Sequence, residues 1–418
     1  MVKTDAVIIG GGLAGLSAAK ALAAAGLKPL LLEAQAEVGG RVATDSVDGF
    51  LLDRGFQVFL DSYPEARKQL NLPALQLGRF APGAQIWRGN GFGRVADPWR
   101  APLAGLRSLT SGVFTVADAL RMLRLRSDAI LALEGEPVEH GDETAAKALH
   151  RRGFSDRAVE GFFRPFFGGV FLDSQMLAPQ HWFEFLFGMF ATGSATLPAG
   201  GMQAIPRQLA AALPADSLRL GARVRSLKGG QVELADGEVI EAQAVILATD
   251  ARQAAVLHPG SRRTSWASCA TLYYAAPESP VAEPLLVLDG AGRRGPVNHV
   301  CVPSDVQASY APPEQALVSA TVLEHANNDD GALDHEARLQ LSQWFGETPV
   351  RRWRLLRVAR VPFSLPRNVP RPDAVSEAVR ISAGLYACGD YVETPSINGA
   401  LRSGRRAAEA LLADLHRR

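Results

Sequence analysis

Cysteine is scarce in this sequence. Among 418 residues there are three cysteines, Cys269, Cys301 and Cys388, which lie far apart and form no C-x-x-C pair. Secreted scaffolds held together by disulfides need closely spaced and usually even-numbered cysteines, so that class is excluded. The simplest expectation is a reduced protein of the cytoplasm.

The sequence also lacks long apolar runs and an excess of either charge. No uncharged stretch approaches the length that crosses a bilayer, and the first apolar run, Ala6–Ile9, is too short for a secretory signal. Lys and Arg number 44 against 43 Asp and Glu, whereas binding nucleic acid through bulk charge needs a strong basic excess. We therefore expect a soluble protein, at most peripheral to a membrane, with no nucleic-acid partner.

What is present fits a globular protein of more than one domain. Hydrophobic residues make up 47% of the chain and charged residues 21%, which is near the usual globular mix and excludes a disordered or fibrous chain. At about 150 residues per domain, the length predicts two or three domains.

The N-terminal segment predicts a strand, a tight turn, a helix and a second strand. The first strand is Ala6–Ile9, a run of helix formers begins at Ser17, and the second strand, Pro29–Leu32, ends at Glu33. The turn reads Gly10-Gly11-Gly12-Leu13-Ala14-Gly15, a G-x-G-x-x-G motif. In such a unit the glycines let a pyrophosphate approach, the helix N-terminus binds the phosphates, and the acidic residue binds ribose hydroxyls. The segment is therefore predicted to bind a dinucleotide.

A second match to the same motif occurs at Gly290–Gly295. The residues that follow it, Pro296–Val300, are typical of a strand rather than a helix. Because the strand–turn–helix context is missing, we interpret this match as a hairpin turn.

Further motifs follow along the whole chain. They are Gly39-Gly40-Arg41, Asp53-Arg54-Gly55, Leu197-Pro198-Ala199-Gly200-Gly201-Met202, Ala248-Thr249 and Gly389-Asp390. Together with the N-terminal unit, these motifs resemble the flavin-containing amine oxidase superfamily, and most closely its oxidoreductases of the phytoene desaturase and protoporphyrinogen oxidase types. The resemblance implies FAD as the cofactor.

The resemblance also implies which residues contact FAD. Arg41 would lie near the pyrophosphate, Asp390 near the ribityl or phosphate region, and Val224 near the adenine through its backbone. The backbone at 397–400 would face the flavin, where the positive end of a helix suits the charge of reduced flavin. The implied set is Gly10, Gly12, Leu13, Ala14, Gly15, Glu33, Ala34, Gly39, Gly40, Arg41, Gly55, Phe56, Gln57, Val224, Thr249, Gly389, Asp390, Ile397, Asn398 and Ala400.

The implied fold is α/β, with a Rossmann-like FAD-binding domain interleaved with an α+β substrate domain. The FAD-binding domain would comprise residues 1–60, 196–260 and 375–418. The substrate domain would comprise residues 61–195, expected to be helical, and residues 261–374, expected to form a mixed sheet.

Phenylalanine is concentrated between positions 154 and 190. This segment holds ten of the eighteen phenylalanines: Phe154, Phe162, Phe163, Phe166, Phe167, Phe171, Phe183, Phe185, Phe187 and Phe190. One interpretation is the core of the helical part, and the other is an apolar substrate tunnel above the flavin. Neighbouring Phe-Phe steps place rings on different helix faces, so not all of them can point into one core.

Arginine is concentrated between Arg351 and Arg371, where no acidic residue occurs. The default interpretation is a solvated strand face. The alternative is a surface that meets anionic lipid headgroups or substrate carboxylates, which would suit an enzyme that draws its substrate from a membrane.

No protein nucleophile stands in a catalytic context. The motifs G-x-S-x-G and H-E-x-x-H are absent, and the eight histidines form no ligand cluster, so no metal site is expected. The flavin would therefore carry the redox chemistry. Catalytic residues stay unassigned, with three candidates, Gln57, Tyr274 and His299. Further polar residues considered for the pocket are Arg164, His181 and Glu184.

Many amine oxidases of this superfamily have a lysine in the substrate domain. Here the last lysine is Lys228, and Trp266–Ala276, where that lysine would lie, has none. This favours dehydrogenation of an apolar, polyene-like or tetrapyrrole-like substrate by hydride transfer to FAD. The alternatives are a flavin-dependent amine oxidase, a non-redox carotenoid isomerase, and a flavin protein that sequesters a ligand. Since no nicotinamide-binding unit is evident, the expected electron acceptor is oxygen or a quinone.

Overall fold

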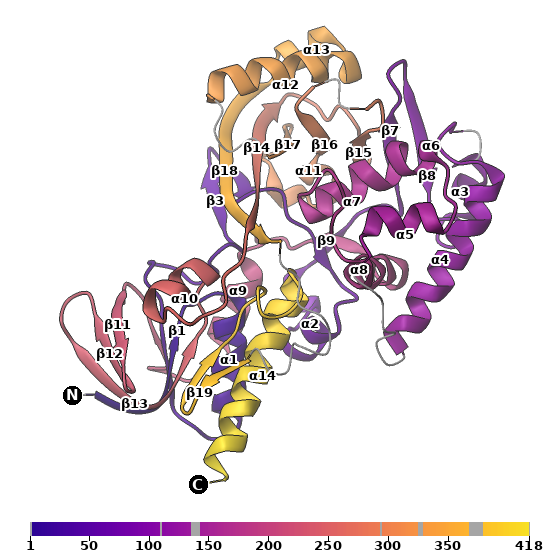
Figure 1. Ribbon diagram of the computed structural model, residues 1–418. Helices are drawn as coiled ribbons and strands as arrows, with labels where there is room; N and C mark the ends of the chain where they lie inside the picture. The colour runs from indigo at the N-terminus through magenta and orange to yellow at the C-terminus, as the bar shows by residue number, and fades with distance from the viewer. Residues whose placement is uncertain are drawn as a thin grey trace.

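The chain forms two lobes in the computed structural model, which describes residues 2–108, 111–134, 143–292, 295–324, 329–367 and 379–417 (Figure 1). Both ends of the chain lie in the same lobe, at the lower left of Figure 1. Each lobe is built on a sheet of its own.

The first sheet combines strands from three distant parts of the sequence. Its order is β10 (Leu218–Arg219), β2 (Pro29–Leu32), β1 (Val2–Ile9), β13 (Val239–Leu247), β12 (Gln231–Leu234) and β11 (Val224–Lys228), with β20 (Leu385–Ala387) beside β13 and β19 (Arg380–Ser382) beside β20. The pairs that β1 and β13 make with each other, with β2 and with β20 are parallel. Parallel strands buried on both faces read as continuous apolar runs, which explains the sequence of β1.

Two helices from opposite ends of the chain pack together beside this sheet. α1 (Leu13–Ala24) and α14 (Ile397–Leu415) approach so closely that a Cβ at Gly404 would lie 2.1 Å from the carbonyl oxygen of Ala14. The hydroxyl of Ser17 donates a hydrogen bond to the carbonyl of Leu401 at 2.7 Å. This contact brings the N-terminal turn and the start of α14 to the same edge of the sheet.

The second sheet has seven strands and is mostly antiparallel. Its order is β18 (Arg354–Pro366), β14 (Trp266–Ala276), β17 (Ala316–Leu323), β16 (Val297–Cys301), β15 (Leu286–Asp289), β7 (Gly83–Trp87) and β8 (Phe92–Ala96). One face is covered by α12 (Asp330–Phe345), through Leu333, Ala337 and Leu341. β7 and β8 come from the part of the chain that was expected to be helical.

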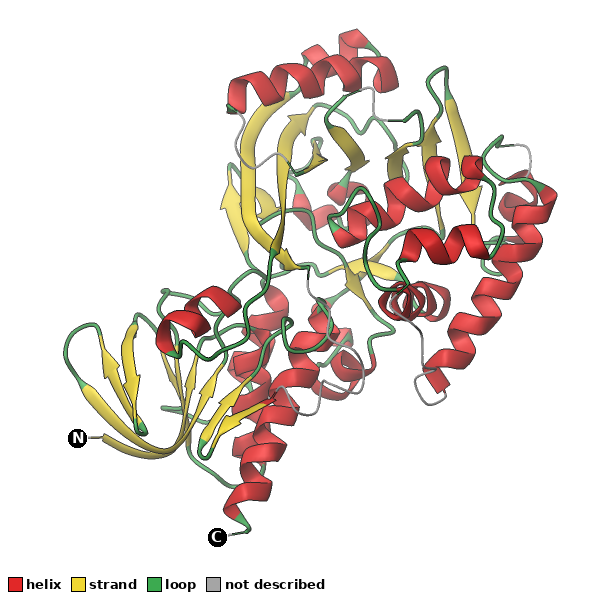
Figure 2. Cartoon of the chain, viewed as in Figure 1, coloured by secondary structure: helices red, strands yellow, loops and turns green. Residues whose placement is uncertain are grey.

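Helices cover the other side of the second lobe (Figure 2). They include α3 (Pro102–Ser108), α4 (Val116–Glu134), α5 (Ala145–Arg151), α7 (Arg164–Phe171) and α8 (Gln180–Thr192). A short helix, α13 (Glu347–Arg351), follows α12 and packs against it. A π-helical turn, η2 (Val159–Phe163), joins the short α6 (Asp156–Ala158) to α7. None of the described helices combines the length and the apolar character needed to cross a membrane.

The remaining elements are short, and several of them lie where the two lobes meet. They are β3 (Thr44–Val47), β4 (Phe50–Asp53), β5 (Phe59–Leu60), β6 (Gly78–Arg79), β9 (Ala195–Leu197), α2 (Pro64–Gln69), α9 (Ala204–Ala211), α10 (Ala251–Leu257), α11 (Pro303–Val306), η1 (Pro73–Leu75) and η3 (Ala308–Tyr310). β3 pairs with β4, and β9 lies between β5 and β6.

A buried carboxylate, Asp53, holds this connection together. One of its oxygens accepts from the hydroxyl of Thr44 at 2.5 Å and the backbone N–H of Met202 at 3.0 Å, and the other accepts from the hydroxyl of Tyr310 at 2.8 Å. The hydroxyl of Tyr273 on β14 donates to the Asp53 carbonyl at 2.8 Å. Burial raises the pKa of Asp53 to about 6, although these hydrogen bonds act to lower it.

The structure confirms the predicted α/β class and the hairpin at the second glycine motif, since β15 and β16 are antiparallel neighbours. Residues 293 and 294 of that motif lie outside the described residues. The domain boundaries stay a prediction, and position 375 also lies outside the described residues.

Candidate functional site

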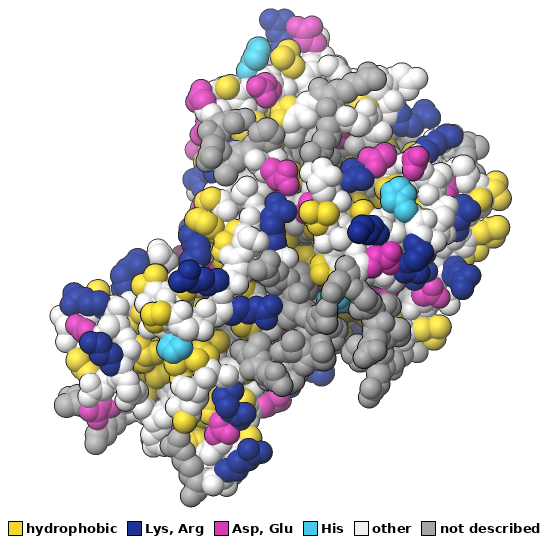
Figure 3. All heavy atoms as spheres, viewed as in Figure 1, with side chains coloured by type: hydrophobic (Ala, Val, Ile, Leu, Met, Phe, Trp, Pro, Cys, Tyr) yellow, Lys and Arg dark blue, Asp and Glu magenta, His cyan; other side chains and the backbone are white. Residues whose placement is uncertain are grey.

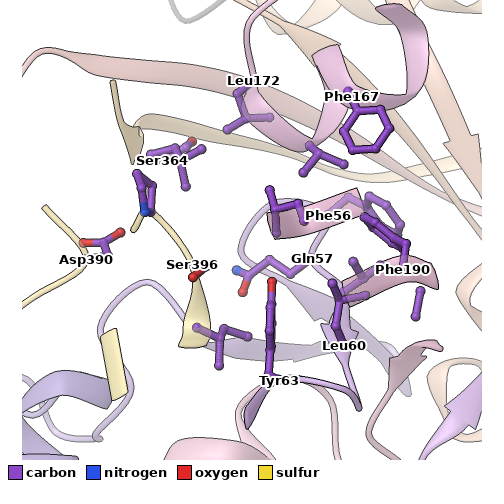
Figure 4. A pocket seen from close by; sticks show the side chains of 18 of the residues that line it. Phe56, Gln57, Leu60, Tyr63, Phe167, Leu172, Phe190, Ser364, Asp390 and Ser396 are labelled. Carbon is purple, nitrogen blue, oxygen red and sulfur yellow. The ribbon is translucent and has the colours of Figure 1, made fainter. Parts of the chain in front are cut away.

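A cavity of about 1350 Å³ extends from the glycine turn of the first lobe into the helices of the second. Figure 4 shows its middle, where Asp390 and Ser396 lie on one side and Phe167 and Phe190 on the other. Along its length the lining changes from backbone and charged groups to aromatic side chains.

The glycine turn between β1 and α1 forms one end of the cavity. Gly10 has a φ of +114°, and a Cβ there would lie 2.7 Å from the carbonyl oxygen of Ala248. A Cβ at Gly12 would meet nothing within 4 Å, so this residue leaves the space in front of α1 open. No side chain caps α1. The first backbone N–H groups of the helix, at Leu13 and Ala14, therefore lie beside the cavity with the positive end of the helix dipole.

Glu33 lies at the carboxyl end of β2 and lines the same end of the cavity. Its two carboxylate oxygens accept from the backbone N–H of Gly11 at 2.6 Å and of Gln35 at 2.8 Å. These bonds fix the side chain. A carboxylate oxygen can accept more than one hydrogen bond, so Glu33 can also take hydroxyl donors from the cavity.

Arg41 and Asp390 form an ion pair on the cavity wall. The guanidinium donates two hydrogen bonds to the carboxylate, at 2.5 and 2.8 Å, and one to the Ser364 carbonyl at 2.9 Å. It also lies over the ring of Trp266 at 5.3 Å. Burial acts to lower the pKa of Arg41, but the charge and hydrogen bonds of Asp390 outweigh it, and the net pKa is raised. The guanidinium is therefore a fixed positive charge.

The N-terminus of α14 meets the cavity next to this pair. Ser396 caps the helix by accepting from the Gly399 N–H at 2.9 Å, and Ile397 and Ala400 line the cavity. The Asn398 side chain points elsewhere and accepts from the backbone N–H of Glu65 at 3.0 Å.

The loop after β4 crosses the middle of the cavity. Gly55 has a φ of +84°, and a Cβ there would lie 3.3 Å from Val361. The Gln57 amide nitrogen donates to the carbonyls of Arg41 and Arg54 at 2.9 and 3.2 Å. In Figure 4 the hydroxyl of Tyr63 points toward Gln57.

Aromatic side chains of η2, α7 and α8 wall the far part of the cavity. The lining residues are Phe162, Phe166, Phe167, Phe187, Phe190 and Trp182. Phe154, Phe163 and Phe183 instead pack against one another and their neighbours inside the lobe. Both interpretations of the phenylalanine segment therefore hold, each for a different set of rings.

The cavity reaches the surface at α3 and α4. Trp99, Val116, Leu120 and Leu123 line it there and are exposed. Hydrophobic side chains protrude at the right edge of Figure 3, where Figure 1 places these two helices.

The sequence model described as "Flavin containing amine oxidoreductase" matches residues 13–412. The chain belongs to this family. The match confirms the predicted resemblance and, with it, FAD as the cofactor.

The family members that are similar to this chain are named after different substrates and products. Carotenoid phi-ring synthase of Streptomyces griseus is 27% identical over 384 residues, 82% of this chain and 74% of that protein. The 15-cis-phytoene desaturase of an Oncidium hybrid is 47% identical over 64 residues, 15% of this chain and 11% of that protein. The chain thus spans about a tenth of the length of the phytoene desaturases it matches. A solved double mutant of putrescine oxidase shares the fold, with a TM-score of 0.72 and 18% identity over 99% of both chains.

The residues of the cavity fit the chemistry of FAD. Uncapped N–H groups at an open glycine turn suit a pyrophosphate, and a fixed carboxylate after β2 suits ribose hydroxyls. The helix end at α14 suits the negative charge of a reduced flavin.

The structure brings most of the predicted cofactor residues to this one cavity. Gly15 and Asn398 do not line it, and the other eighteen do. Gly15 acts in packing, since a Cβ there would lie 2.0 Å from the Gly10 carbonyl oxygen.

Of the three catalytic candidates, Gln57 and His299 line the cavity and Tyr274 does not. Tyr274 points to the α12 face of the second sheet, where its hydroxyl donates to Asp334 at 2.8 Å. It lies on that side because successive strand residues face opposite sides of a sheet. Arg164 and Glu184 are also absent from the lining and form ion pairs with Glu160 and Arg152, and His181 is likewise outside it.

The arginine segment is not an open basic surface. Its described members pair with acidic residues from elsewhere in the chain, as in Arg354 with Asp48, Arg357 with Asp45 and Arg360 with Asp330. Arg371 lies outside the described residues. The structure therefore favours the solvated strand face.

Sequence reasoning missed several lining residues. Tyr63 reaches the cavity from the position just before α2, and Cys269 and Ser364 reach it from β14 and β18. The alternation of β14 could have indicated Cys269, but no sequence signal marks the other two. Leu120 and Leu123 of α4 also line the cavity, and their helical spacing in the sequence does not tell which side of a helix is covered.

Proposed function

We propose that this protein is an FAD-dependent oxidoreductase that dehydrogenates an extended hydrophobic molecule, of polyene or tetrapyrrole type. The observation that carries the proposal is the continuity of one cavity from the dinucleotide turn to an aromatic wall and on to an apolar mouth. Ligand sites of this kind, mostly apolar with a few placed polar groups, select hydrophobic ligands.

FAD would lie along the residues that line the first half of the cavity. The N–H groups of Leu13 and Ala14 would bind the pyrophosphate, and Glu33 would bind ribose hydroxyls. The adenine would lie by the backbone of Val224, and the flavin by the start of α14. The other residues proposed to line its site are Gly10, Gly12, Ala34, Gly39, Gly40, Arg41, Gly55, Phe56, Gln57, Thr249, Gly389 and Asp390.

When bound, FAD supplies the hydride acceptor for the reaction. The chain itself has to hold the substrate against the flavin and keep water out. The phenylalanine rings of η2, α7 and α8 do both, since they present a rigid apolar wall with no charged group. No lysine lines the described part of the cavity, which argues against the lysine-dependent amine oxidase alternative.

Substrate would enter at the mouth formed by α3 and α4. Leu103, Val116 and Leu120 are 81%, 69% and 63% exposed, a concentration of apolar surface that water does not favour. Arg124 is exposed on the same helix. We propose that this surface rests on an anionic membrane, and that oxygen or a quinone reoxidises the flavin.

Anaerobic reduction tests the proposed function. The FAD-loaded protein is mixed with phytoene, with protoporphyrinogen IX and with putrescine, and the visible absorbance of oxidised flavin is followed. We expect bleaching by the polyene or the tetrapyrrole and none by the amine. Bleaching by putrescine alone would support the amine oxidase instead. Isomerisation of a carotenoid without bleaching would support the isomerase. Binding with neither bleaching nor isomerisation would support a protein that sequesters its ligand.

A cavity variant makes this test specific. Val170→Trp on α7 fills the aromatic part of the cavity and should abolish bleaching while the flavin spectrum stays unchanged. Leu339→Trp, on the exposed side of α12, is the matched control and should bleach as the unmodified protein does.

A further inference from the structure

A row of polar side chains crosses the cavity-facing side of the second sheet. Thr271, Thr321 and His299 lie next to one another on β14, β17 and β16. The opposite side of these strands, including Tyr274 and Val300, packs under α12. Of the row, His299 reaches the cavity lining.

The hydrogen bonds around His299 fix which ring nitrogen carries the proton. The Asn298 amide nitrogen lies 2.9 Å from the Pro165 carbonyl oxygen and 3.0 Å from His299 Nδ1. If the Asn298 amide were turned the other way, its oxygen would lie against the Pro165 carbonyl oxygen, and two acceptors would face each other. The amide nitrogen is therefore the atom that faces both the Pro165 carbonyl and His299 Nδ1. Nδ1 therefore accepts, and a neutral ring carries its proton on Nε2. Burial lowers the pKa of His299 to about 4, so the ring is neutral near pH 7.

The Nε2–H of His299 has no hydrogen-bond partner among the described residues, and the side chain is 4% exposed. The ring is held in place. A Cβ at Gly169 would lie 3.0 Å from its Nδ1, and the centroid of the Phe56 ring lies 5.2 Å from that of His299. Gly169 and Phe56 also line the cavity. A buried donor that no protein group satisfies is costly to keep.

A second residue of the cavity wall, Trp182, carries a buried donor. The indole N–H of Trp182 has no partner among the described residues, and the side chain is 3% exposed. An indole nitrogen can only donate. Both unsatisfied groups of the aromatic part are thus donors, and the complementary group on a ligand is a hydrogen-bond acceptor.

We infer that His299 is a specificity-determining residue, whose Nε2–H binds an acceptor oxygen on an otherwise apolar substrate. The substrate class is then an oxygenated hydrophobic molecule, with a carbonyl, hydroxyl or ester group, rather than a pure hydrocarbon. This inference rests on the proposed function and narrows it. A site built to hydrogen-bond such a group discriminates against an analogue that lacks it, because the buried donor is left unpaired.

Paired carotenoid probes test the inference. Echinenone and β-carotene share a carbon skeleton and differ by one keto oxygen. Each is added in detergent to the FAD-loaded protein, and binding is measured from the quenching of tryptophan fluorescence. We expect echinenone to bind about tenfold more tightly, as one hydrogen bond allows.

Two variants locate the effect. His299→Phe keeps an aromatic ring but removes the donor, and the two probes should then bind equally. His299→Gln retains an N–H near the position of Nε2 and should restore part of the preference. A preference that survives His299→Phe would overturn the role of His299.

The outcomes separate the two proposals. Equal binding of both probes by the unmodified protein would overturn the inference and leave the proposed function standing. If neither probe binds, the polyene form of the proposed function fails, and the inference fails with it.

Discussion

At the scale of single residues, glycines decide where a ligand can approach the backbone. Gly12 and Gly15 belong to one motif but act differently. A Cβ at Gly15 would collide with the Gly10 carbonyl, whereas one at Gly12 would meet only open space in the cavity. Gly12 therefore leaves room for the ligand, and Gly15 allows the close packing of the fold.

Gly12→Ala should therefore weaken FAD binding without harming the protein. Its φ of −74° and ψ of 178° suit alanine, so the thermal midpoint of the apoprotein should not change. The added methyl group would occupy the pyrophosphate space, and we expect a loss of roughly tenfold or more in FAD affinity. Flavin titration of the apoprotein measures it.

Gly331→Ala is the matched control, because Gly331 lies at the start of another helix, in the first turn of α12, and makes only ordinary contacts. Unchanged FAD affinity in Gly12→Ala would contradict the proposed path of the pyrophosphate.

At the scale of elements, α4 shows that spacing and burial are different properties. Leu120, Leu123 and Leu131 recur at helical spacing, yet all three point outward. Its inward side packs on α8 through buried residues such as Leu125 and Ala129. The outward leucines are available to a surface beside the cavity mouth.

Leu120→Glu combined with Leu123→Glu should reduce binding to anionic liposomes. Removing two apolar side chains from a lipid contact and adding two negative charges should lower the bound fraction by at least roughly tenfold. Co-sedimentation at low salt measures the change. The fold should persist, because both positions are exposed.

Leu339→Glu introduces one negative charge at an exposed position of α12, away from the mouth, and should leave liposome binding unchanged. If the unmodified protein does not bind liposomes at low salt, the membrane proposal is wrong.

At the scale of the whole molecule, the lobes meet at the carboxyl group of Asp53. It accepts from Thr44 and Met202 on one side and from Tyr310 on the other. Because burial raises its pKa to about 6, the folded protein favours the protonated form more than the unfolded chain does. The contribution of Asp53 is therefore most favourable at low pH and is lost as pH rises from about 4 to about 6.

Asp53→Asn should remove this pH dependence. Asparagine cannot ionise, so the free energy of unfolding of the variant relative to the unmodified protein should rise by about 2 kcal/mol between pH 4 and pH 7. Thermal midpoints across that range measure it. Asp216→Asn, at an exposed position, should show no such trend, and a flat difference for Asp53→Asn would mean that the carboxylate is ionised throughout.

The sequence by itself determined the cofactor half of this protein. The turn at Gly10–Gly15, Glu33 and the start of α14 are local motifs, whose backbone geometry follows from residues adjacent in the chain. Most of the residues predicted to contact FAD therefore line the cavity.

The tertiary structure alone decided the substrate half. Whether Tyr274 or His299 faces the cavity depends on which side of the second sheet α12 covers, and strand alternation gives both possibilities equally. Pairing of Arg354 with Asp48 likewise joins residues from opposite ends of the sequence. Contacts between distant segments arise only when the lobes fold together, so no local pattern carries them.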